Sequence, residues 1–476
     1  MQSGSDQGSL SRSLGLKLAI VVVIGNILGS GVYKKVAPMA AELDSAVLVL
    51  ICWVLGGLIT LFGALSNAEI AGMFADTGGE VVYYRRIYNR FISFLYGWSH
   101  FAIIKTASIA SLAYVFAMSV HSMAPLPEVL PGLAPLSIGG VFHPFAGFNV
   151  KLLAICLILA LTLFNTYGIK RGMHLSSLLL LLVITGILLI TVFGLASSPS
   201  NIQQVFEITP ATRATGLGTM FTAMLAAFWA YEGWNSVGFV AGEIRNPNKN
   251  VPLALMFGLF GVIAIYLLVN TAYLSLLSTE QLTEIYSSAN QIAAVEAVRV
   301  FGGTTGAFVI SLLILVTTLG CTHASVISNA RIYYALASKN LFFQPVAKVN
   351  KAKVPAGSLW FQGVWASVLV LSGTFDQLTD TLIFAAFIFY GITTLGVFVM
   401  RIREPNLYRP YKVWGYPIIP AFFVLFCAAL TVNTVMTRPR EAAIGLTLIA
   451  IGVPFYFLFK RKANIENKSP KNPDTP

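Results

Sequence analysis

The sequence predicts an all-α integral membrane protein with about twelve transmembrane helices. Of its 476 residues, 56% are hydrophobic and only 11% are charged, whereas a soluble domain carries about 25% charged residues. Apolar runs long enough to cross a hydrocarbon core of about 30 Å recur from one end of the chain to the other. The loops between these runs are alternately rich and poor in Lys and Arg, which is typical of a multi-pass chain.

The apolar runs divide the chain into successive spans. We place them at 15–38, 45–75, 91–120, 150–168, 172–196, 216–242, 252–277, 303–337, 358–373, 377–400, 413–436 and 441–459. The runs 45–75 and 303–337 are longer than a bilayer requires, so these two helices are expected to tilt or to protrude. No stretch between runs is long enough for a soluble domain of at least about 50 residues. We therefore expect one membrane domain over 15–460, with polar tails at 1–14 and 461–476.

The net charge of +12 is arranged as a topology signal. If both ends of a twelve-span chain lie in the cytoplasm, its basic residues favour the cytoplasmic loops by about three to one. This bias predicts a plasma or inner membrane protein with both termini in the cytoplasm, and it gives no indication of nucleic-acid binding. No cleavable signal peptide is evident, because the first 17 residues are polar and the first apolar run lacks a small-residue cleavage site.

The four cysteines, Cys52, Cys156, Cys321 and Cys427, all fall inside predicted spans. The predicted outer loops have none, so we expect neither internal disulfides nor a disulfide-linked partner subunit. No spacing resembles a zinc site, and no Ser/His/Asp or phosphate-loop pattern has a supporting context. The sequence therefore predicts no cofactor, no metal site and no enzyme.

Two predicted spans contain helix-breaking sequences in their middle. The first is "GNILGSG" at 25–31, and the second is "FWAYEGW" at 228–234, about 200 residues later. Interrupted segments at corresponding positions in two halves of a chain indicate a secondary transporter that binds its substrate near the bilayer midplane. Unwound backbone is tolerated at that depth only where it is buried in protein or lines a wet cavity.

The chemistry of the two breaks matches a zwitterion. In the first, glycines expose backbone N–H groups, Ser30 offers a hydroxyl, and the half-helix that follows points its positive end at the break, which suits a carboxylate. In the second, freed carbonyls around Ala227, Phe228 and Ala230 suit an ammonium group, and the large aromatic side chain of Trp229 is placed to cover the substrate. The predicted substrate-binding residues are Ile27, Gly29, Ser30, Gly31, Ala227, Phe228, Trp229, Ala230 and Glu232. Glu232 fits two roles, binding a substrate amine or capping the broken helix.

Several stretches resemble the L-type amino acid transporters of the amino acid–polyamine–organocation superfamily. They are "GNILGSGVY", "GALSNAEIAGMFADTGGEVVYYRRIY", "FWAYEGWNSVGFVAGEIRNPNKNVPLAL" and "EPNLYRPYKVWGYPIIP". The resemblance implies inverted repeats of five helices each, at about 15–196 and 216–400, followed by two extra helices at about 413–459. It also implies that Gly29, Ser30 and Gly31 hold the substrate carboxylate, that Phe228 and Ala230 hold the amine, and that Trp229 is the gating aromatic residue.

Two ionisable residues within the spans are candidates for gating or coupling. Glu69 lies toward the cytoplasmic end of the second span, and we expect it to pair with Arg85 or Arg86 and to close the inner side. Lys105 lies midway along the third span. An intramembrane cation requires a partner or a watery cavity, so both a paired residue and a coupling residue fit this position.

The chain departs from the family pattern at two places. Many ion-independent members carry a lysine part-way along the fifth helix, and the matching stretch 176–186 has none. Thr317 and Thr318 on the eighth span offer hydroxyl oxygens for a sodium ion, although such hydroxyls also serve as hydrogen bonds within and between helices. Lys34 and Lys35 follow the first break where the family usually has uncharged residues. Attraction of an anionic substrate to the outer vestibule fits them, but we expect them to extend toward the outer membrane interface.

The sequence thus predicts an alternating-access amino acid transporter that exchanges neutral L-amino acids. Two alternatives stay open: proton- or sodium-coupled uptake, and transport of cationic amino acids or polyamines, for which Glu232 is the one acid within the breaks. A membrane enzyme or a nutrient sensor is disfavoured, because the chain has no catalytic pair, no metal cluster and no signalling domain. Side-chain selectivity is not predicted.

Overall fold

The computed structural model describes residues 15–74, 80–167, 172–207, 216–234, 244–288, 290–338 and 341–466. The regular secondary structure within these ranges consists of helices, as the composition predicts. The predicted N-terminal tail lies outside the described residues, as does the C-terminal tail after residue 466.

The first half of the chain begins with three short helices and continues with helices of mixed length. They are α1 (Leu16–Ile27), α2 (Gly31–Lys34), α3 (Val36–Leu43), α4 (Ala46–Met73), α5 (Glu80–Ile87), α6 (Arg90–Ser99), the π-helical turn η1 (His100–Ile104), α7 (Lys105–Met123), the 3-10 turn η2 (Pro131–Leu133), α8 (Phe148–Thr166), α9 (Gly172–Ala196) and α10 (Ile202–Phe206).

The second half begins with another interrupted helix. Its elements are α11 (Leu217–Tyr231), α13 (Pro247–Leu276), α14 (Thr279–Ser287), α15 (Ala293–Ser338), the 3-10 turn η5 (Gln344–Ala347), α16 (Ala356–Ser372), α17 (Phe375–Arg403), α18 (Ile418–Thr437) and α19 (Pro439–Glu466). Helix α15 bends at Gly303, whose backbone is left-handed (φ 59°), and the predicted span 303–337 begins at this bend.

Eight helical segments in the described ranges are long and apolar enough to cross a membrane. Four shorter apolar helices occur beside them: Leu16–Ile27, Leu180–Ala196, Leu217–Tyr231 and Ala356–Ser372. Two of the four, α1 and α11, are short because each ends at a predicted break. The all-α multi-pass architecture is therefore confirmed, while the exact count of twelve spans stays a prediction.

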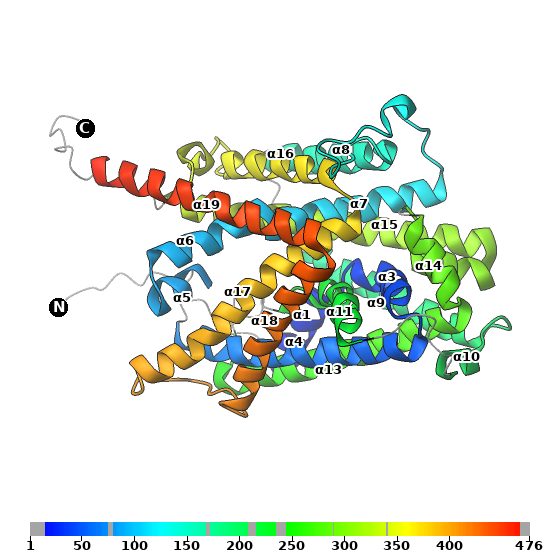
Figure 1. Ribbon diagram of the computed structural model, residues 1–476, viewed down its shortest axis with the longest axis horizontal. Helices are drawn as coiled ribbons and strands as arrows, with labels where there is room; N and C mark the ends of the chain where they lie inside the picture. The colour runs from blue at the N-terminus through cyan, green and yellow to red at the C-terminus, as the bar shows by residue number, and fades with distance from the viewer. Residues whose placement is uncertain are drawn as a thin grey trace.

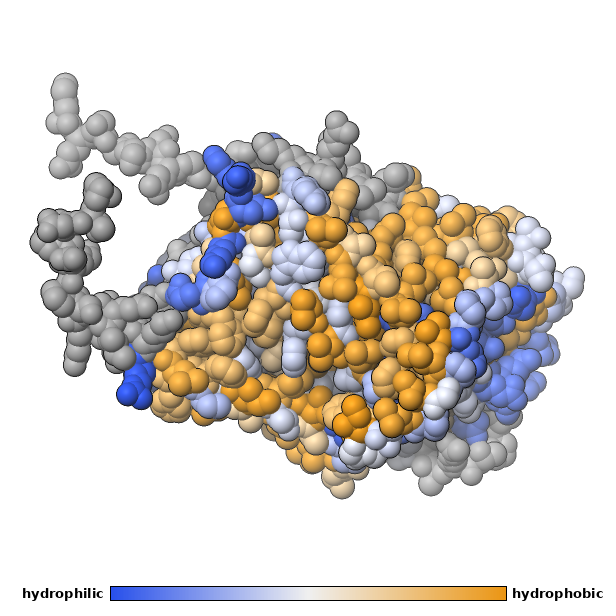
Figure 2. Space-filling model, turned by 90° about the horizontal axis from the view of Figure 1, so that it is seen from above, coloured by the Kyte–Doolittle hydropathy of each residue, from blue (hydrophilic) through white to orange (hydrophobic). Residues whose placement is uncertain are grey.

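The loops gather at two opposite ends of a helical bundle (Figure 1). The turn before α18 and the C-terminal end of α19 lie at one end, together with α5 and the start of α6, whereas α10 and α14 lie at the other. We call these the inner and outer ends, following the predicted topology. Figure 2 shows a broad hydrophobic band across the middle of one face, with hydrophilic residues gathered toward the ends. Such a large exposed apolar surface is typical of a membrane protein.

The interrupted helices occupy the middle of the bundle (Figure 1). Helix α11 contacts α3, α4, α17 and α18, and α1 packs against α13. The start of α17 is fixed by a capping box, in which the Thr374 hydroxyl accepts the Gln377 N–H and the Gln377 side chain accepts the Thr374 N–H. Because α1 and α11 pack against other helices in the middle of the bundle, the fold places both breaks away from the lipid-facing surface.

Candidate functional site

The first break lies between α1 and α2. Helix α1 ends at Ile27, Leu28 has an extended backbone (φ −67°, ψ 104°), and α2 begins at Gly31. Lys35 keeps helical angles, so α2 runs on into α3 as one helical segment. The first N–H groups of a helix have no acceptor within it, and the helix dipole makes this end positive. The break is confirmed, in the later half of the predicted "GNILGSG".

The second break begins later than predicted. Helix α11 runs to Tyr231, Glu232 is extended (φ −61°, ψ 143°), and Gly233 has a φ of 113°. Residues 235–243 are outside the described ranges. The prediction that the Ala227 carbonyl is freed is wrong, because this carbonyl lies inside the helix, four residues before its end. The carbonyls of the last turn, from Phe228 onward, lack the usual helical donor four residues later, although the Trp229 carbonyl accepts the Glu232 N–H at 3.2 Å.

The two breaks touch each other. A Cβ atom on Gly31 would lie 2.6 Å from the Cα of Ala230, and a Cβ on Gly233 would lie 2.2 Å from the carbonyl oxygen of Asn26. Glycine at both positions therefore permits backbone-to-backbone contact. Tyr266 of α13, which the sequence analysis missed, joins the breaks: its hydroxyl lies 2.7 Å from the carbonyl oxygen of Ala230 and 3.4 Å from that of Ile27.

Three buried side-chain atoms in or next to the segments that form the breaks have no hydrogen-bond partner among the described residues. They are the Ser30 Oγ, the Tyr33 hydroxyl in α2 and the Trp229 Nε1. The Trp229 ring packs edge-on against Phe375 of α17, with centroids 6.1 Å apart. Leaving a buried polar group unpaired costs about 1–3 kcal/mol. Partners supplied by a bound ligand would remove this cost.

We predict that Ser30→Ala weakens substrate binding without weakening the fold. The Ser30 hydroxyl makes no hydrogen bond in the described structure, so its removal costs no internal bond. Loss of one hydrogen bond to a charged substrate group raises the KM about tenfold. The measurement is uptake kinetics together with thermal unfolding in detergent. Thr162→Val is the matched control, because the buried Thr162 hydroxyl of α8 is also unpartnered and should leave KM unchanged. An unaltered KM in Ser30→Ala would contradict this role.

Lys105 and Glu232 form an ion pair at the second break. The Lys105 Nζ lies 3.7 Å from Glu232 Oε1, and the two side chains are 20% and 12% exposed. The Tyr390 hydroxyl of α17 lies 2.9 and 2.8 Å from the two carboxylate oxygens of Glu232. The structure thus supplies the partner that an intramembrane lysine requires. Tyr390 was not predicted, because nothing in its local sequence distinguishes it from other aromatic residues.

Lys34 and Lys35 are buried, and the expectation that they extend to the interface is wrong. Their side chains are 2% and 0% exposed. The Lys35 Nζ lies 2.7 Å from Asp376 Oδ1 and donates to the Thr379 hydroxyl at 2.7 Å, and Lys34 lies 3.6 Å from the same aspartate. Both ammonium groups also lie over the Phe375 ring. These contacts join α2 to α17 on the outer side of the breaks.

Glu69 is fully buried, but its partners are not the predicted Arg85 and Arg86. Its carboxylate accepts hydrogen bonds from Arg401 Nε and Nη2 at 2.9 and 2.7 Å and from the Val413 N–H at 2.6 Å. Arg409 Nε lies 3.4 Å away. Glu69 therefore ties α4 to the inner end of α17 and to the loop that follows.

Thr317 and Thr318 donate their hydroxyls to the Ile314 carbonyl of their own helix, at 3.0 and 2.7 Å. This bonding is the common local role of threonine in membrane helices, and it favours the structural interpretation over a sodium site. No group of three or more His, Cys, Asp and Glu side chains is arranged for a metal ion within the described ranges.

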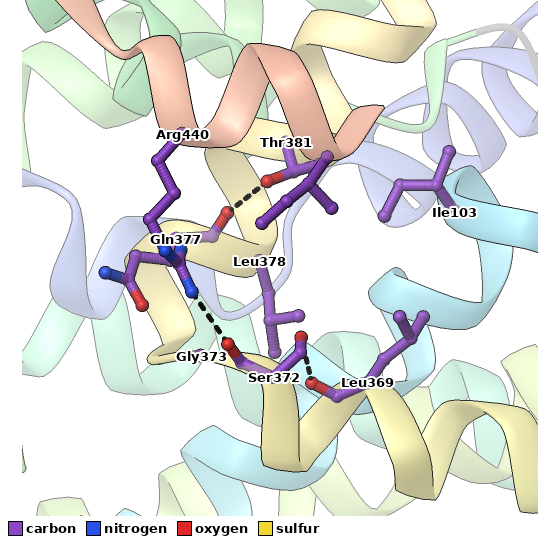
Figure 3. Close-up of a pocket in the computed structure, with 9 residues that line it drawn as sticks. Ile103, Leu369, Ser372, Gly373, Gln377, Leu378, Thr381 and Arg440 are labelled. Carbon is purple, nitrogen blue, oxygen red and sulfur yellow. Dashed lines mark hydrogen bonds between the residues drawn. The ribbon is translucent and has the colours of Figure 1, made fainter. Parts of the chain in front are cut away.

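A separate small pocket lies between α16, α17 and the start of α19, with Ile103 of η1 also in its lining (Figure 3). Arg440 is one of its lining residues and donates to the Ser372 carbonyl at 2.8 Å. None of the predicted substrate-binding residues lines this pocket. The site predicted at the breaks and this pocket are therefore different places in the molecule.

The chain is similar to known transport proteins over nearly its full length. The amino acid permease family matches residues 14–458. The serine/threonine exchanger SteT of Bacillus subtilis (strain 168) is 30% identical over 464 residues, which cover 97% of this chain and 100% of that protein. The b(0,+)-type amino acid transporter 1 of Mus musculus is 28% identical over 95% of this chain and 88% of its own length. The large neutral amino acids transporter small subunit 2 of Homo sapiens is 27% identical over 96% and 82%.

Proposed function

Because this chain belongs to the amino acid permease family, we propose that it exchanges neutral L-amino acids across the cell membrane by alternating access. The observation that carries this proposal is the direct contact between two helix breaks, with unpartnered Ser30 and Trp229 atoms beside them. The names of the similar proteins, a serine/threonine exchanger and neutral or b(0,+)-type amino acid transporters, support the same chemistry.

The proposed site holds the two charged groups common to all amino acids. The substrate carboxylate lies at the start of α2, against Gly29, Gly31 and the Ser30 hydroxyl, where the helix dipole favours an anion. The ammonium group faces the end of α11, where the last-turn carbonyls are freed. The Ala230 carbonyl already accepts the Tyr266 hydroxyl, so the Phe228 carbonyl is the better ammonium acceptor. Trp229 covers the substrate from the outer side.

Alternating access also requires parts that move against each other. We propose the two halves predicted from the sequence, α1 to α9 and α11 to α17, as the repeats, with α18 and α19 outside them. The Lys35–Asp376 pair between α2 and α17 is a contact that outward opening would break.

We keep the predicted cytoplasmic location of both termini. We also keep the prediction of no disulfide-linked partner, because all four cysteines lie within membrane helices.

Exchange is tested with purified protein in lipid vesicles. We expect rapid uptake of labelled L-serine when the vesicles contain unlabelled L-serine, and slow uptake when they are empty. Equal uptake by empty vesicles under a pH or sodium gradient would contradict exchange and would favour the coupled alternative. If verified folded protein takes up no amino acid under any of these conditions, transport itself is refuted.

A further inference from the structure

A cation and an anion neutralise each other at the second break. Lys105 of α7 and Glu232 at the end of α11 are 3.7 Å apart, Nζ to Oε1. Both side chains keep some exposure, 20% and 12%, so neither is sealed in the core. Charges within a membrane span are expensive and mark functional positions.

The position of Glu232 is fixed next to the first break. It is the C-cap residue of α11, and the following Gly233 lies against the Asn26 carbonyl at the end of α1. The Tyr390 hydroxyl holds the carboxylate in place from α17. Tyr390 is itself positioned by ring contacts with Trp234 and Phe387, with centroids 5.0 and 5.7 Å away. A substrate held at both breaks therefore lies next to this carboxylate.

Lys105 has hydrogen-bonding capacity to spare. At 3.7 Å its contact with Glu232 is an ion pair, longer than the usual hydrogen-bond limit of about 3.2 Å. No hydrogen bond and no other ion pair joins its ammonium to a described residue, although this group can donate three hydrogen bonds. The lysine also begins α7 directly after the π-helical turn η1, a type of distortion that is frequent at functional sites.

We propose that Lys105, Glu232 and Tyr390 bind the substrate side chain. Together they restrict transport to amino acids with uncharged side chains and favour side chains that carry a hydroxyl or an amide. This inference rests on the proposed amino acid transport. A hydroxyl or amide can donate to the Glu232 carboxylate and accept from the Lys105 ammonium. A cationic side chain would meet Lys105, and an anionic one would meet Glu232, so both are rejected by like charge. A purely aliphatic side chain would leave the hydrogen-bonding groups unpaired.

The test compares Lys105→Met and Glu232→Gln in vesicles loaded with L-serine, using inhibition of labelled L-serine uptake by L-serine, L-leucine, L-lysine and L-glutamate. We expect the wild type to prefer L-serine and to ignore both charged amino acids. In Lys105→Met the Glu232 charge is uncompensated, so L-lysine should gain at least about tenfold in inhibition relative to L-serine. In Glu232→Gln the Lys105 charge is uncompensated, so L-glutamate should gain inhibition relative to L-serine by a similar factor. The double variant should lose its preference for L-serine over L-leucine, because it keeps neither charged hydrogen-bonding group.

Controls separate this inference from a folding defect and from the proposed function. Lys105→Arg keeps the charge and should keep the wild-type ranking. Glu296→Gln removes one charge of the Glu296–Arg299 pair on α15, which belongs to neither of the two breaks, and should also keep the wild-type ranking. If Glu232→Gln and Lys105→Met transport L-serine and rank the four inhibitors as the wild type does, the inference is overturned. The proposed amino acid transport is unaffected by that result. If the wild type takes up none of the four amino acids, the proposed function fails first.

Discussion

Replacing Gly31 with alanine should reduce amino acid exchange about 100-fold, because a displacement of about 1 Å at a binding site can cost this much. The Cβ of alanine would lie 2.6 Å from the Cα of Ala230 and 2.7 Å from its Cβ. Real Cβ contacts are not this short, so α2 and α11 must move apart. The proposed carboxylate site on α2 and the proposed ammonium site on α11 would then be too far apart to bind the same amino acid.

Gly261→Ala in α13 is the matched control for this substitution, because Gly261 is not one of the proposed binding residues. The nearest atom to a Cβ on Gly261 is Ile24 Cδ1 at 3.6 Å, which is ordinary contact, so this variant should keep wild-type exchange. Exchange rates per folded molecule in vesicles provide the measurement. Equal activity of Gly261→Ala and Gly31→Ala would show that close contact between α2 and α11 is not required.

The sequence was sufficient to locate both breaks because helix breaking is a local property. Glycine and serine in "GNILGSG" are poor helix formers wherever they occur, and α1 ends within this stretch. The end of α11 was placed too early for a related reason. Its residues from Phe228 to Tyr231 have no intrinsic helix-breaking tendency, and the break begins only where Glu232 is followed by Gly233.

The partners of the buried charges could not be predicted in the same way. Lys35 and Asp376 are 341 residues apart, and Glu69 and Arg401 are 332 apart. Such pairs depend on how distant helices pack, and no local pattern encodes that. Sequence proximity suggested Arg85 and Arg86 for Glu69, whereas the fold brings α17 to it. Tyr266 and Tyr390 were missed because their roles also come from packing.

Replacing Glu69 with glutamine should have the largest effect on stability. Removing one member of a buried ion pair typically costs about 3–5 kcal/mol, because the partner charge is left uncompensated. Glu69 is fully buried and compensates two arginines, of which Arg409 is also nearly buried. Glutamine keeps an acceptor for the Val413 N–H but loses the negative charge. Thermal unfolding in detergent should show a much lower midpoint than for the wild type.

The exposed pair of Glu296 and Arg299 gives the comparison for this variant. These side chains are 22% and 41% exposed, and pairs of this kind contribute at most about 1 kcal/mol. Glu296→Gln should therefore unfold nearly as the wild type does. Arg409 also donates to the carbonyls of Pro405, Leu407, Met400 and Glu404, so its ion pair with Glu69 links α4 to the end of α17 and the start of the loop that follows. If Glu69→Gln unfolds like Glu296→Gln, these carbonyls alone hold Arg409, and α4 is not tied to the loop by charge.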